Sequence, residues 1–273
     1  MKHLLLTLDL EEFVPAAEFS EHLAEKEAFE LGRQGFDNVM NLLKEKQVKA
    51  TLFTTAEFAE FAEESIKRAI RDGHELASHG YSHKHDYRKM LPAEAFSNLK
   101  SAKDLLEKKF GKKILGFRAP QMFHPDRAIL KKIGFQYDSS FHPTYIPGRY
   151  NNFFGKRKIF SENGIVVVPV SVTPILRLPY SWVWFRLLGL NYSKLCTMLT
   201  LADQEYVNIY FHPWEFIDVN KYNFEKIPKS RTKNAGEHLL KKLSLYLDWC
   251  NKLKLKSMTI SDYLQNYGSK RFF

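Results

Sequence analysis

Cysteines, long apolar runs and low-complexity tracts are scarce or missing in this sequence of 273 residues. The two cysteines, Cys196 and Cys250, lack the close spacing of a metal or redox motif, so we expect two reduced thiols in the core. No stretch approaches eighteen uncharged apolar residues, so no transmembrane helix is expected. The first residues turn acidic too soon for a secretory signal. We therefore expect a cytoplasmic location, which includes the inner face of the membrane.

The composition is that of a folded domain with unevenly distributed charge. With 44% hydrophobic and 14% aromatic residues, the chain can bury a large core. The formal net charge is +10, yet residues 1–75 hold more acidic than basic side chains, so the positive excess lies in the rest of the chain. A basic surface suits an anionic polymer or a membrane face. The lysines and arginines are scattered and form no nucleic-acid motif, so nucleic acid is not an expected partner.

Apolar or β-branched runs alternate with amphipathic segments along the whole chain. This alternation predicts a parallel sheet covered by helices, and we expect an α/β fold with one domain, residues 1–273, built as a distorted (β/α) barrel of seven to eight parallel strands. The expected strands are 4–8, 50–54, 74–78, 114–117, 136–138, 164–170, 206–211 and 256–260. The expected helices are 36–46, 56–71, 92–110, 124–133 and 235–253.

Two segments depart from this alternation. Residues 141–159 are rich in proline, glycine, tyrosine and asparagine, and we expect a long loop there. Residues 179–190 hold a run of aromatic side chains that includes Trp182 and Trp184, with basic residues on either side. A buried helix explains such a run. A sugar-stacking wall or a membrane-interface patch explains it as well, because aromatic rings offer stacking area and amphipathic anchoring.

His79 and His83 stand four residues apart, directly after one of the expected strands. Four residues make one helical turn or one tight loop, so both imidazoles can face one point, and two histidines with a carboxylate form a common hydrolytic zinc site. The carboxyl ends of strands are where α/β folds collect ligands and catalytic groups. The pair alone is a weak signal, because ten histidines in a chain of this length produce such a spacing by chance.

Ionisable side chains follow several other expected strands as well. They are Asp9, Glu11 and Glu12 after the first strand, Arg118 after the fourth, Asp138 at the end of the fifth and His212 after the seventh. On a random surface such groups would not follow strand ends, whereas the mouth of a barrel requires it. We therefore expect these side chains to share one site with the two histidines.

Taken in order, these segments resemble five short motifs of the polysaccharide deacetylases of carbohydrate esterase family four, which share a nodulation-type deacetylase domain. The Asp-x-Glu of residues 9–11 and the His-Pro-Trp-Glu of residues 212–215 resemble the exopolysaccharide-associated subgroup most closely. The resemblance covers most of the chain. It implies a metal-dependent hydrolase that removes an acetyl group from an N-acetylated sugar of a cell-surface or exported polysaccharide, or of its lipid-linked precursor.

The resemblance also implies a metal site. His79 and His83 match the two histidine ligands of the family. The first motif of the family usually has two adjacent aspartates, but here a leucine follows Asp9. Glu11 is the expected third ligand, because in an extended segment it shares a face with Asp9, and Glu12 is the alternative. Two histidines and one carboxylate fit zinc, and they also fit iron or cobalt.

Further residues match the catalytic groups of the family. Asp9 matches the base that takes a proton from the nucleophilic water, and Arg118 matches the arginine that orients this base. His212 matches the acid that protonates the leaving nitrogen, and Asp138 matches the carboxylate partner of that histidine. The backbone amide near Gln121 would donate to the oxyanion.

Other functions stay open on the sequence alone. The displaced carboxylate after Asp9 is also compatible with a metal-independent amidase of the allantoinase-like branch. The aromatic run near Trp182 is compatible with a non-catalytic module that binds carbohydrate or a lipid headgroup through a decayed site. Intact Asp9, Arg118 and His212 argue against decay, because a relic is expected to lose its acid or its base. A peripheral contact with a membrane is a further expectation from the basic and aromatic residues.

Overall fold

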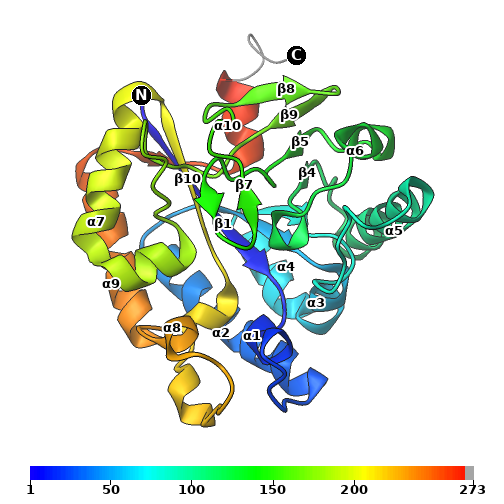
Figure 1. The fold of residues 1–273 in the computed structure, drawn as a ribbon, viewed down its shortest axis with the longest axis horizontal. Coiled ribbons are helices and arrows are strands. Elements are labelled where there is room, and N and C mark those ends of the chain that lie inside the picture. The colour runs from blue at the N-terminus through cyan, green and yellow to red at the C-terminus, as the bar shows by residue number, and fades with distance from the viewer. Residues whose placement is uncertain (268–273) are drawn as a thin grey trace.

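The structure is a computed structural model that describes residues 1–267. At its centre lies a curled, largely parallel β-sheet, and helices surround this sheet (Figure 1). The parallel strands are β1 (His3–Leu10), β2 (Ala50–Thr54), β3 (Glu75–Ser78), β4 (Gly116–Phe117), β5 (Tyr137–Asp138), β9 (Ile165–Val167), β10 (Tyr206–Phe211) and β11 (Lys256–Ser257). The other strands are β8 (Phe160–Glu162), antiparallel to β9, and the hairpin of β6 (Tyr145–Ile146) and β7 (Tyr150–Asn151).

The strand order is β10–β1–β2–β3–β4–β5–β9–β8, and β11 pairs with the start of β1. The sheet curls into a half-barrel, and all its pairs are parallel except the pair of β8 with β9. This arrangement confirms the expected α/β fold, with a distorted barrel of parallel strands in a single domain. Parallel strands end at the same edge of a sheet, so the segments that follow β1, β3, β4 and β10 meet at one rim.

The helices differ widely in length. The α-helices are α1 (Val14–Glu18), α2 (Glu25–Glu45), α3 (Ala56–Phe61), α4 (Glu63–Arg71), α5 (Pro92–Phe110), α6 (Arg127–Ile133), α7 (Trp182–Asp203), α8 (Lys229–Thr232), α9 (Glu237–Lys252) and α10 (Ile260–Tyr267). Three short 3₁₀ helices are η1 (Pro120–Met122), η2 (Pro213–Phe216) and η3 (Val219–Tyr222).

The alternation of side chains along β1 decides what reaches the inside of the barrel. All eight residues of β1 are buried. Its even-numbered leucines pack into the core cluster shared with the helices, whereas Leu5 packs with Phe53 in the second, inner cluster. Successive side chains of a strand point to opposite faces, so Thr7 and Asp9 continue the inner face that Leu5 begins. The strand therefore carries an acidic side chain into the barrel at its carboxyl end.

Most expected elements are present, with shifted ends. Strands β2 and β10 and helix α5 occupy the expected ranges. The expected helix 56–71 is divided into α3 and α4, because Ala62 leaves the helical conformation between them. The expected loop 141–159 contains the β6–β7 hairpin, and the aromatic run begins helix α7, which extends to Asp203.

Two further observations bear on the expectations about cysteines and membrane spans. Cys196 and Cys250 are both buried free thiols, as expected. Within residues 1–267, none of the helices combines the length and the apolar character that a membrane crossing requires.

Candidate active site

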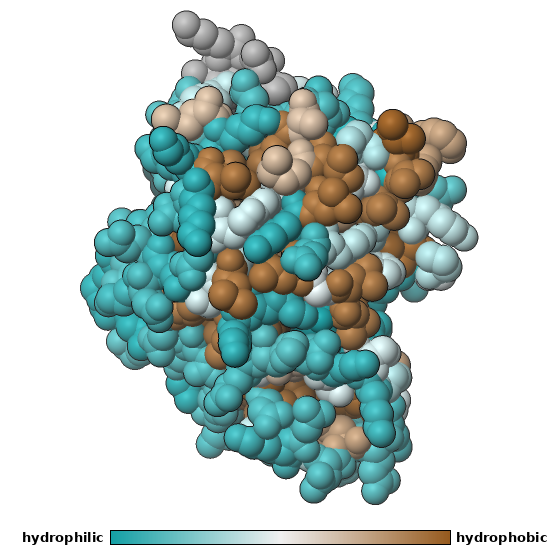
Figure 2. All heavy atoms as spheres, turned by 90° about the vertical axis from the view of Figure 1, so that its left-hand side faces the viewer, coloured by the Kyte–Doolittle hydropathy of each residue, from teal (hydrophilic) through white to brown (hydrophobic). Residues whose placement is uncertain are grey.

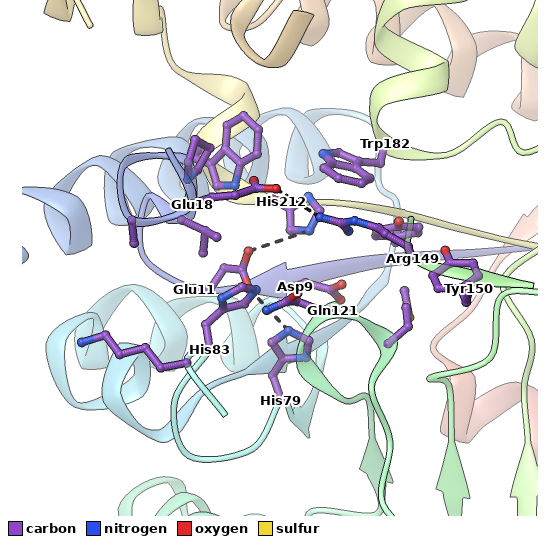
Figure 3. Close-up of a pocket in the computed structure, with 17 residues that line it drawn as sticks. Asp9, Glu11, Glu18, His79, His83, Gln121, Arg149, Tyr150, Trp182 and His212 are labelled. Carbon is purple, nitrogen blue, oxygen red and sulfur yellow. Dashed lines mark hydrogen bonds and ion pairs between the residues drawn. The ribbon is translucent and has the colours of Figure 1, made fainter. Parts of the chain in front are cut away.

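A pocket of about 370 Å³ opens at the carboxyl edge of the sheet, and it collects side chains from distant parts of the chain (Figure 3). Those expected from the sequence that line it are Asp9, Glu11, His79, His83, Gln121 and His212. Arg118 lies behind the wall of the pocket, fully buried, and contacts it through Asp9. Asp138 does not line the pocket. The structure thus brings together all but one of the expected site residues.

Glu11 lies between the two histidines. Its Oε2 atom is 3.4 Å from Nε2 of His79 and 3.4 Å from Nε2 of His83, and this buried oxygen has no hydrogen-bond partner. Two ligands of a tetrahedral zinc ion bound at about 2.0–2.1 Å stand roughly 3.3 Å apart. Glu12 is also buried, but within residues 1–267 both histidine ion pairs are made by Glu11 and none by Glu12. The geometry therefore favours Glu11 over Glu12 as the third ligand.

The protonation states of Glu11, His79 and His83 are also compatible with a bound cation. Burial lowers the pKa of His79 to about 4 and the pKa of His83 to about 3, so both imidazoles are neutral at neutral pH. Nδ1 of His79 lies 2.8 Å from the carbonyl of Arg118; a proton on Nδ1 leaves the Nε2 lone pair directed at Glu11. Burial, with the neighbouring Glu12 and Asp9, raises the pKa of Glu11 well above its ordinary value.

Within residues 1–267, no group of three or more His, Cys, Asp and Glu side chains is arranged as a complete metal site. Glu11, His79 and His83 nevertheless fit one in chemistry: an unpartnered buried carboxylate oxygen faces two neutral imidazole nitrogens. A divalent cation would supply the positive charge that this carboxylate lacks.

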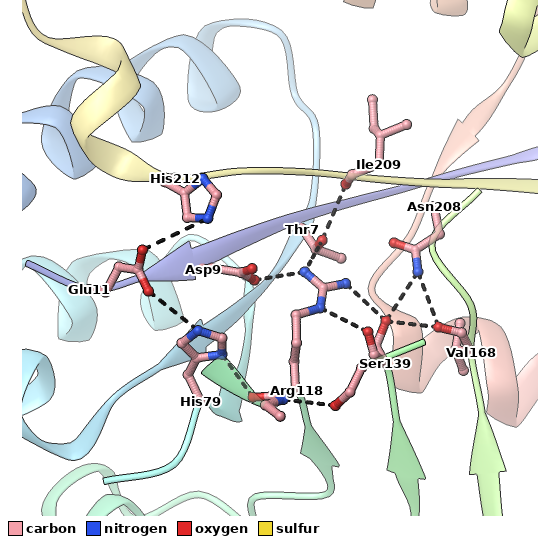
Figure 4. A network of polar contacts seen from close by, with 12 residues as sticks. Thr7, Asp9, Glu11, His79, Arg118, Ser139, Val168, Asn208, Ile209 and His212 are labelled. Carbon is pink, nitrogen blue, oxygen red and sulfur yellow. Dashed lines mark hydrogen bonds and ion pairs between the residues drawn. The ribbon is translucent and has the colours of Figure 1, made fainter. Parts of the chain in front are cut away.

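Asp9 is held by Arg118 at the centre of a buried network (Figure 4). Nη1 of Arg118 donates to Oδ1 of Asp9 at 2.7 Å and to the hydroxyl of Thr7 at 2.8 Å. The other guanidinium nitrogens donate to the carbonyl and the hydroxyl of Ser139 at 3.1 and 2.9 Å. Burial alone would raise the pKa of Asp9, but the charge and hydrogen bond of Arg118, together with His79 and His212, outweigh burial and lower the pKa below its ordinary value. Asp9 is therefore an ionised, fixed carboxylate.

His212 has a carboxylate partner, and this partner is Glu215. Nδ1 of His212 lies 3.4 Å from Oε1 of Glu215, and the His212 backbone amide donates to the same oxygen at 3.0 Å. Glu215 is fully buried, and its Oε2 accepts from Nε of the equally buried Arg186 at 3.0 Å. Nε2 of His212 faces the pocket, 3.8 Å from Oε1 of Glu11. A charged chain therefore runs from α7 through η2 to the pocket.

The expected pairing of Asp138 with His212 is not formed in the described part of the chain. Oδ2 of Asp138 accepts from Nε of Arg127 on α6 at 2.8 Å, and Oδ1 accepts from Ser140. The reason is the alternation along β5. Tyr137 packs inside the barrel, so Asp138 points outward to α6, and Ser139 points inward again to Arg118.

The sequence contained a signal for the Glu215–Arg186 pair. Each is a charged residue in an otherwise apolar, aromatic stretch, and charged side chains are almost never fully buried unless they are paired. Which of the many arginines pairs with Glu215 depends on how α7 packs against η2, and the sequence does not disclose that packing.

Two glycines of α2 allow this helix to approach both halves of the site. A Cβ atom on Gly32 would lie 2.5 Å from the carbonyl oxygen of Glu11, and one on Gly35 would lie 1.9 Å from the carbonyl oxygen of Pro213. Any side chain at either position would therefore push on backbone. Helix α2 therefore packs directly against the segment that holds Glu11 and against the segment that follows His212.

Comparison with known proteins shows what part of the sequence and the whole fold are similar to. Residues 28–137 match the model of the family described as polysaccharide deacetylase. The peptidoglycan deacetylase of Helicobacter pylori (strain ATCC 700392 / 26695) is 31% identical over 122 residues, which cover 42% of this chain and 41% of that protein. The chain thus matches less than half the length of this curated relative.

Solved structures resemble the fold over nearly the whole chain. A Mycobacterium smegmatis protein described as a polysaccharide deacetylase aligns with a TM-score of 0.67 at 18% identity, covering 100% of this chain and 92% of that one. A Pseudomonas aeruginosa PAO1 protein of the same description gives 0.68 at 18%, covering 99% and 92%. Puue allantoinase gives 0.67 at 18%, covering 99% and 91%. At this identity the solved structures show a shared fold, and the sequence matches to the polysaccharide deacetylase model and to the peptidoglycan deacetylase each cover less than half of this chain.

Proposed function

We propose that the chain is a metal-dependent de-N-acetylase, with residues 1–273 as its catalytic domain. Its substrate is an N-acetylated sugar of a cell-surface or exported polysaccharide, or of a lipid-linked precursor, as in the exopolysaccharide-associated subgroup. One observation carries the proposal: an ionised carboxylate, Asp9, and a carboxylate-backed imidazole, His212, line the same pocket as the Glu11–His79–His83 group. The family match supports the reaction class.

Asp9 is the base in this proposal. Its Oδ1 is engaged by Arg118, which leaves Oδ2 to accept a proton from the attacking water. Arg118 keeps the carboxylate charged and prevents it from turning away. Because the guanidinium is fixed by Thr7 and Ser139 at the same time, this orientation exists before substrate binds.

His212 is the acid. Glu215 accepts from Nδ1 and stabilises the positive imidazolium, which can then deliver the proton on Nε2 to the leaving amine nitrogen. Trp182 packs edge-on against His212 with ring centroids 5.0 Å apart, and Trp214 stacks on it at 5.8 Å. These aromatic walls fix the ring plane and limit access of water.

Glu11, His79 and His83 would hold the metal, with zinc as the first choice and iron or cobalt as alternatives. When bound, such an ion supplies Lewis-acid chemistry, lowering the pKa of water and polarising a carbonyl. Gln121 lines the pocket in a left-handed backbone conformation, with φ of 54°. Strained backbone of this kind clusters at functional sites, and it supports a role for the neighbouring amide in binding the oxyanion.

The experiment that tests this function measures metal content and acetate release together. Purified protein is analysed for bound zinc, iron and cobalt and is incubated with N-acetylglucosamine oligomers and peptidoglycan fragments. We expect acetate release that falls on chelation and returns with metal. His79→Ala should abolish metal binding and acetate release, whereas His124→Ala, which changes a residue outside the pocket, should leave metal content and acetate release unchanged. Full metal content and activity in His79→Ala would refute the site.

Two competing functions give different outcomes in the same experiment. A metal-independent amidase would keep its activity after chelation, and its support is the shared fold of the allantoinase at 18% identity. A non-catalytic glycan-binding module would bind the oligomers without releasing acetate, even with metal added. The Glu11–His79–His83 group disfavours the first, and intact Asp9 and His212 disfavour the second.

A further inference from the structure

A second pocket, of about 310 Å³, adjoins the candidate active site. The two pockets share Arg149, Tyr150, Trp182 and Tyr210 as lining residues. Figure 3 shows Arg149, Trp182 and Tyr150 on the side of the active site where His212 lies. A group bound in the second pocket would therefore be a direct neighbour of the sugar that reacts.

Two arginines from different elements line this second pocket. Arg149 comes from the β6–β7 hairpin and Arg231 from α8, and both donate to the same oxygen, Oε1 of Glu18 on α1, at 3.3 and 2.6 Å. Both guanidinium groups also lie over the ring of Trp182, at 5.7 and 5.3 Å from its centroid. Two positive charges share one carboxylate, so the cluster keeps one uncompensated positive charge.

The same pocket has hydrogen-bonding nitrogens without partners. Nε2 of His142 and Nε1 of Trp182 are buried and have no partner in the described residues, and His142 is only 2% exposed. Nδ1 of His142 lies 2.8 Å from the hydroxyl of Tyr150. When that hydroxyl donates to Nδ1, Nε2 carries the proton and is a donor without a partner within residues 1–267. The pocket thus offers an excess of positive charge and donors.

We propose that this pocket is an anion subsite, formed by Arg149, Arg231, His142 and Trp182, for a phosphate or carboxylate group of the glycan. It rests on the proposed deacetylase function and narrows the substrate to a glycan with an anionic group next to the N-acetyl sugar. Phosphate and carboxylate oxygens accept bonds from arginine in matching geometry. Glu18 occupies part of the arginine donor set, and the anion competes with it.

The test measures binding to the purified protein by calorimetry, without turnover. The probes are N-acetylglucosamine 1-phosphate, N-acetylmuramic acid and neutral N-acetylglucosamine. We expect at least one charged sugar to bind roughly tenfold more tightly than the neutral one, as charge-assisted hydrogen bonds predict. Which of the two binds identifies phosphate or carboxylate. Arg149→Gln and Arg231→Gln should each abolish this preference. Arg157→Gln, which removes an arginine bound to Asp203 outside the pocket, is the matched control and should keep it.

Glu18→Gln separates a binding role from a structural one. Loss of the competing carboxylate should tighten binding of the charged sugar several-fold, whereas a cluster that only holds α1 and α8 in place would bind no better. Equal affinity for all three sugars overturns the subsite. Because binding is read without catalysis, acetate release without charge preference refutes the subsite alone. Charged-sugar binding without acetate release refutes the deacetylase alone.

An independent observation concerns the outer side of α7, which faces the viewer in Figure 2. Exposed apolar side chains recur along this helix at helical spacing: Leu188, Leu195, Met198 and Leu199 are 51, 59, 50 and 42% exposed. Figure 2 shows hydrophobic side chains gathered on this side of the molecule. Large contiguous apolar patches are rare on soluble monomers and mark interaction surfaces.

A loop beside α7 extends the same patch. Residues 173–178 form a tight loop closed by the bridge between Val172 and Pro179. Ile175 and Leu176 at its tip are 85 and 66% exposed. The carbonyl of Pro179 accepts from the hydroxyl of Tyr192, which places the loop against α7. We call the combined surface the α7 face, formed by Ile175, Leu176, Leu178, Leu188, Leu195, Met198 and Leu199.

We infer that the α7 face docks on a bilayer that carries anionic headgroups. Arg177 in the loop and Lys194 on α7 belong to the same two elements as the α7 face, and neither of them is ion-paired with a carboxylate of residues 1–267. Two copies of the chain that met through this face would bring these like charges together, whereas an anionic bilayer attracts them. The loop tip would bury its two apolar side chains at the headgroup boundary.

Co-sedimentation with vesicles tests this surface. We expect the chain to pellet with phosphatidylcholine vesicles that contain an equal amount of phosphatidylglycerol, and several-fold less with phosphatidylcholine alone. The variant Ile175→Ser with Leu176→Ser should lose the binding. Leu91→Ser, which changes a 73% exposed leucine outside the α7 face, should keep it. Binding unaffected by the loop variant, or a dimer in solution that the same variant dissociates, overturns the inference.

Discussion

Oε1 of Glu215 lies 3.4 Å from Nδ1 of His212, while the other oxygen of the same carboxylate is held at 3.0 Å by Arg186. Glu215 and Arg186 are fully buried. A carboxylate that is fixed from behind cannot rotate away from the imidazole, so the orientation of His212 depends on an arginine on a different helix. Glu215 therefore acts both on His212 and on the stability of the fold, and a single substitution of Glu215 changes both at once.

Glu215→Gln keeps the shape of the side chain and removes its charge. We expect acetate release to fall about a hundredfold, because the imidazolium of His212 loses its stabilising partner. We also expect the free energy of unfolding to fall by roughly 3–5 kcal/mol, because Arg186 is left buried without its counter-charge. Kinetics and denaturant unfolding measure the two effects on one preparation.

The double variant Arg186→Met with Glu215→Gln tells stability and catalysis apart. It should recover most of the lost stability, since an apolar replacement of a buried ion pair is often neutral, and it should stay catalytically impaired. Recovery of activity together with stability would mean that Glu215 acts on the fold only. Asp138→Asn tests the expected pairing of Asp138 with His212, which the structure does not form. This variant should lower the free energy of unfolding more than it lowers the rate of acetate release.

Asp9→Asn tests the base without touching the expected metal ligands. We expect acetate release to fall by about 10²–10⁴-fold, because the amide cannot take the proton from water. Metal content should stay at the wild-type level, since Glu11, His79 and His83 are unchanged. A parallel loss of metal would instead make Asp9 a ligand, and this outcome would overturn the assignment of roles.

Much of the fold follows from local sequence pattern. Strands β2 and β10 and helix α5 were predicted in full because their own residues define them: β-branched and apolar runs for the strands, and a proline start with a glycine stop for the helix. The same pattern placed Asp9, His79 and His212 at strand ends, and parallel pairing then brought them together.

The errors arise where the tertiary packing decides. Asp138 was placed at the correct strand end, but a two-residue strand does not reveal which side chain points inward, and Tyr137 takes the inner position. Glu215 contacts Arg186 through packing between α7 and η2, elements separated by a strand. The long loop hid the β6–β7 hairpin, and with it Arg149, because turn residues alone do not specify strands so short.

Gly35→Ala should damage the site through the backbone. The added Cβ would meet the carbonyl of Pro213, so α2 or the segment after His212 must move. Overpacking of this kind costs about 1–3 kcal/mol, and we expect a comparable loss in the free energy of unfolding with a drop in acetate release. Asn41→Ala, at an exposed position of the same helix, is the control and should leave both unchanged. Unaltered stability in Gly35→Ala would show that α2 has room to retreat.

His74 gives a pH-dependent contribution to stability that is separate from the candidate site. It is 7% exposed, its Nδ1 accepts from the backbone amide of Ala50 at 3.1 Å, and burial lowers its pKa from 6.5 to about 4. Between these two values the unfolded chain binds a proton that the folded chain excludes. The contribution is therefore fully present above about pH 6.5 and is lost as the pH falls toward about 4, on the order of 3 kcal/mol in total.

His74→Asn removes this titration while an amide oxygen can still accept the Ala50 bond. Urea unfolding at about pH 7 and about pH 5 should show a smaller loss of stability in the variant than in the wild type. Burial also lowers the pKa of other histidines, among them His142. The variant should therefore keep part of the pH dependence of the free energy of unfolding. An unchanged slope would mean that His74 is neutral in both states or protonated in both, and that its burial carries no electrostatic cost.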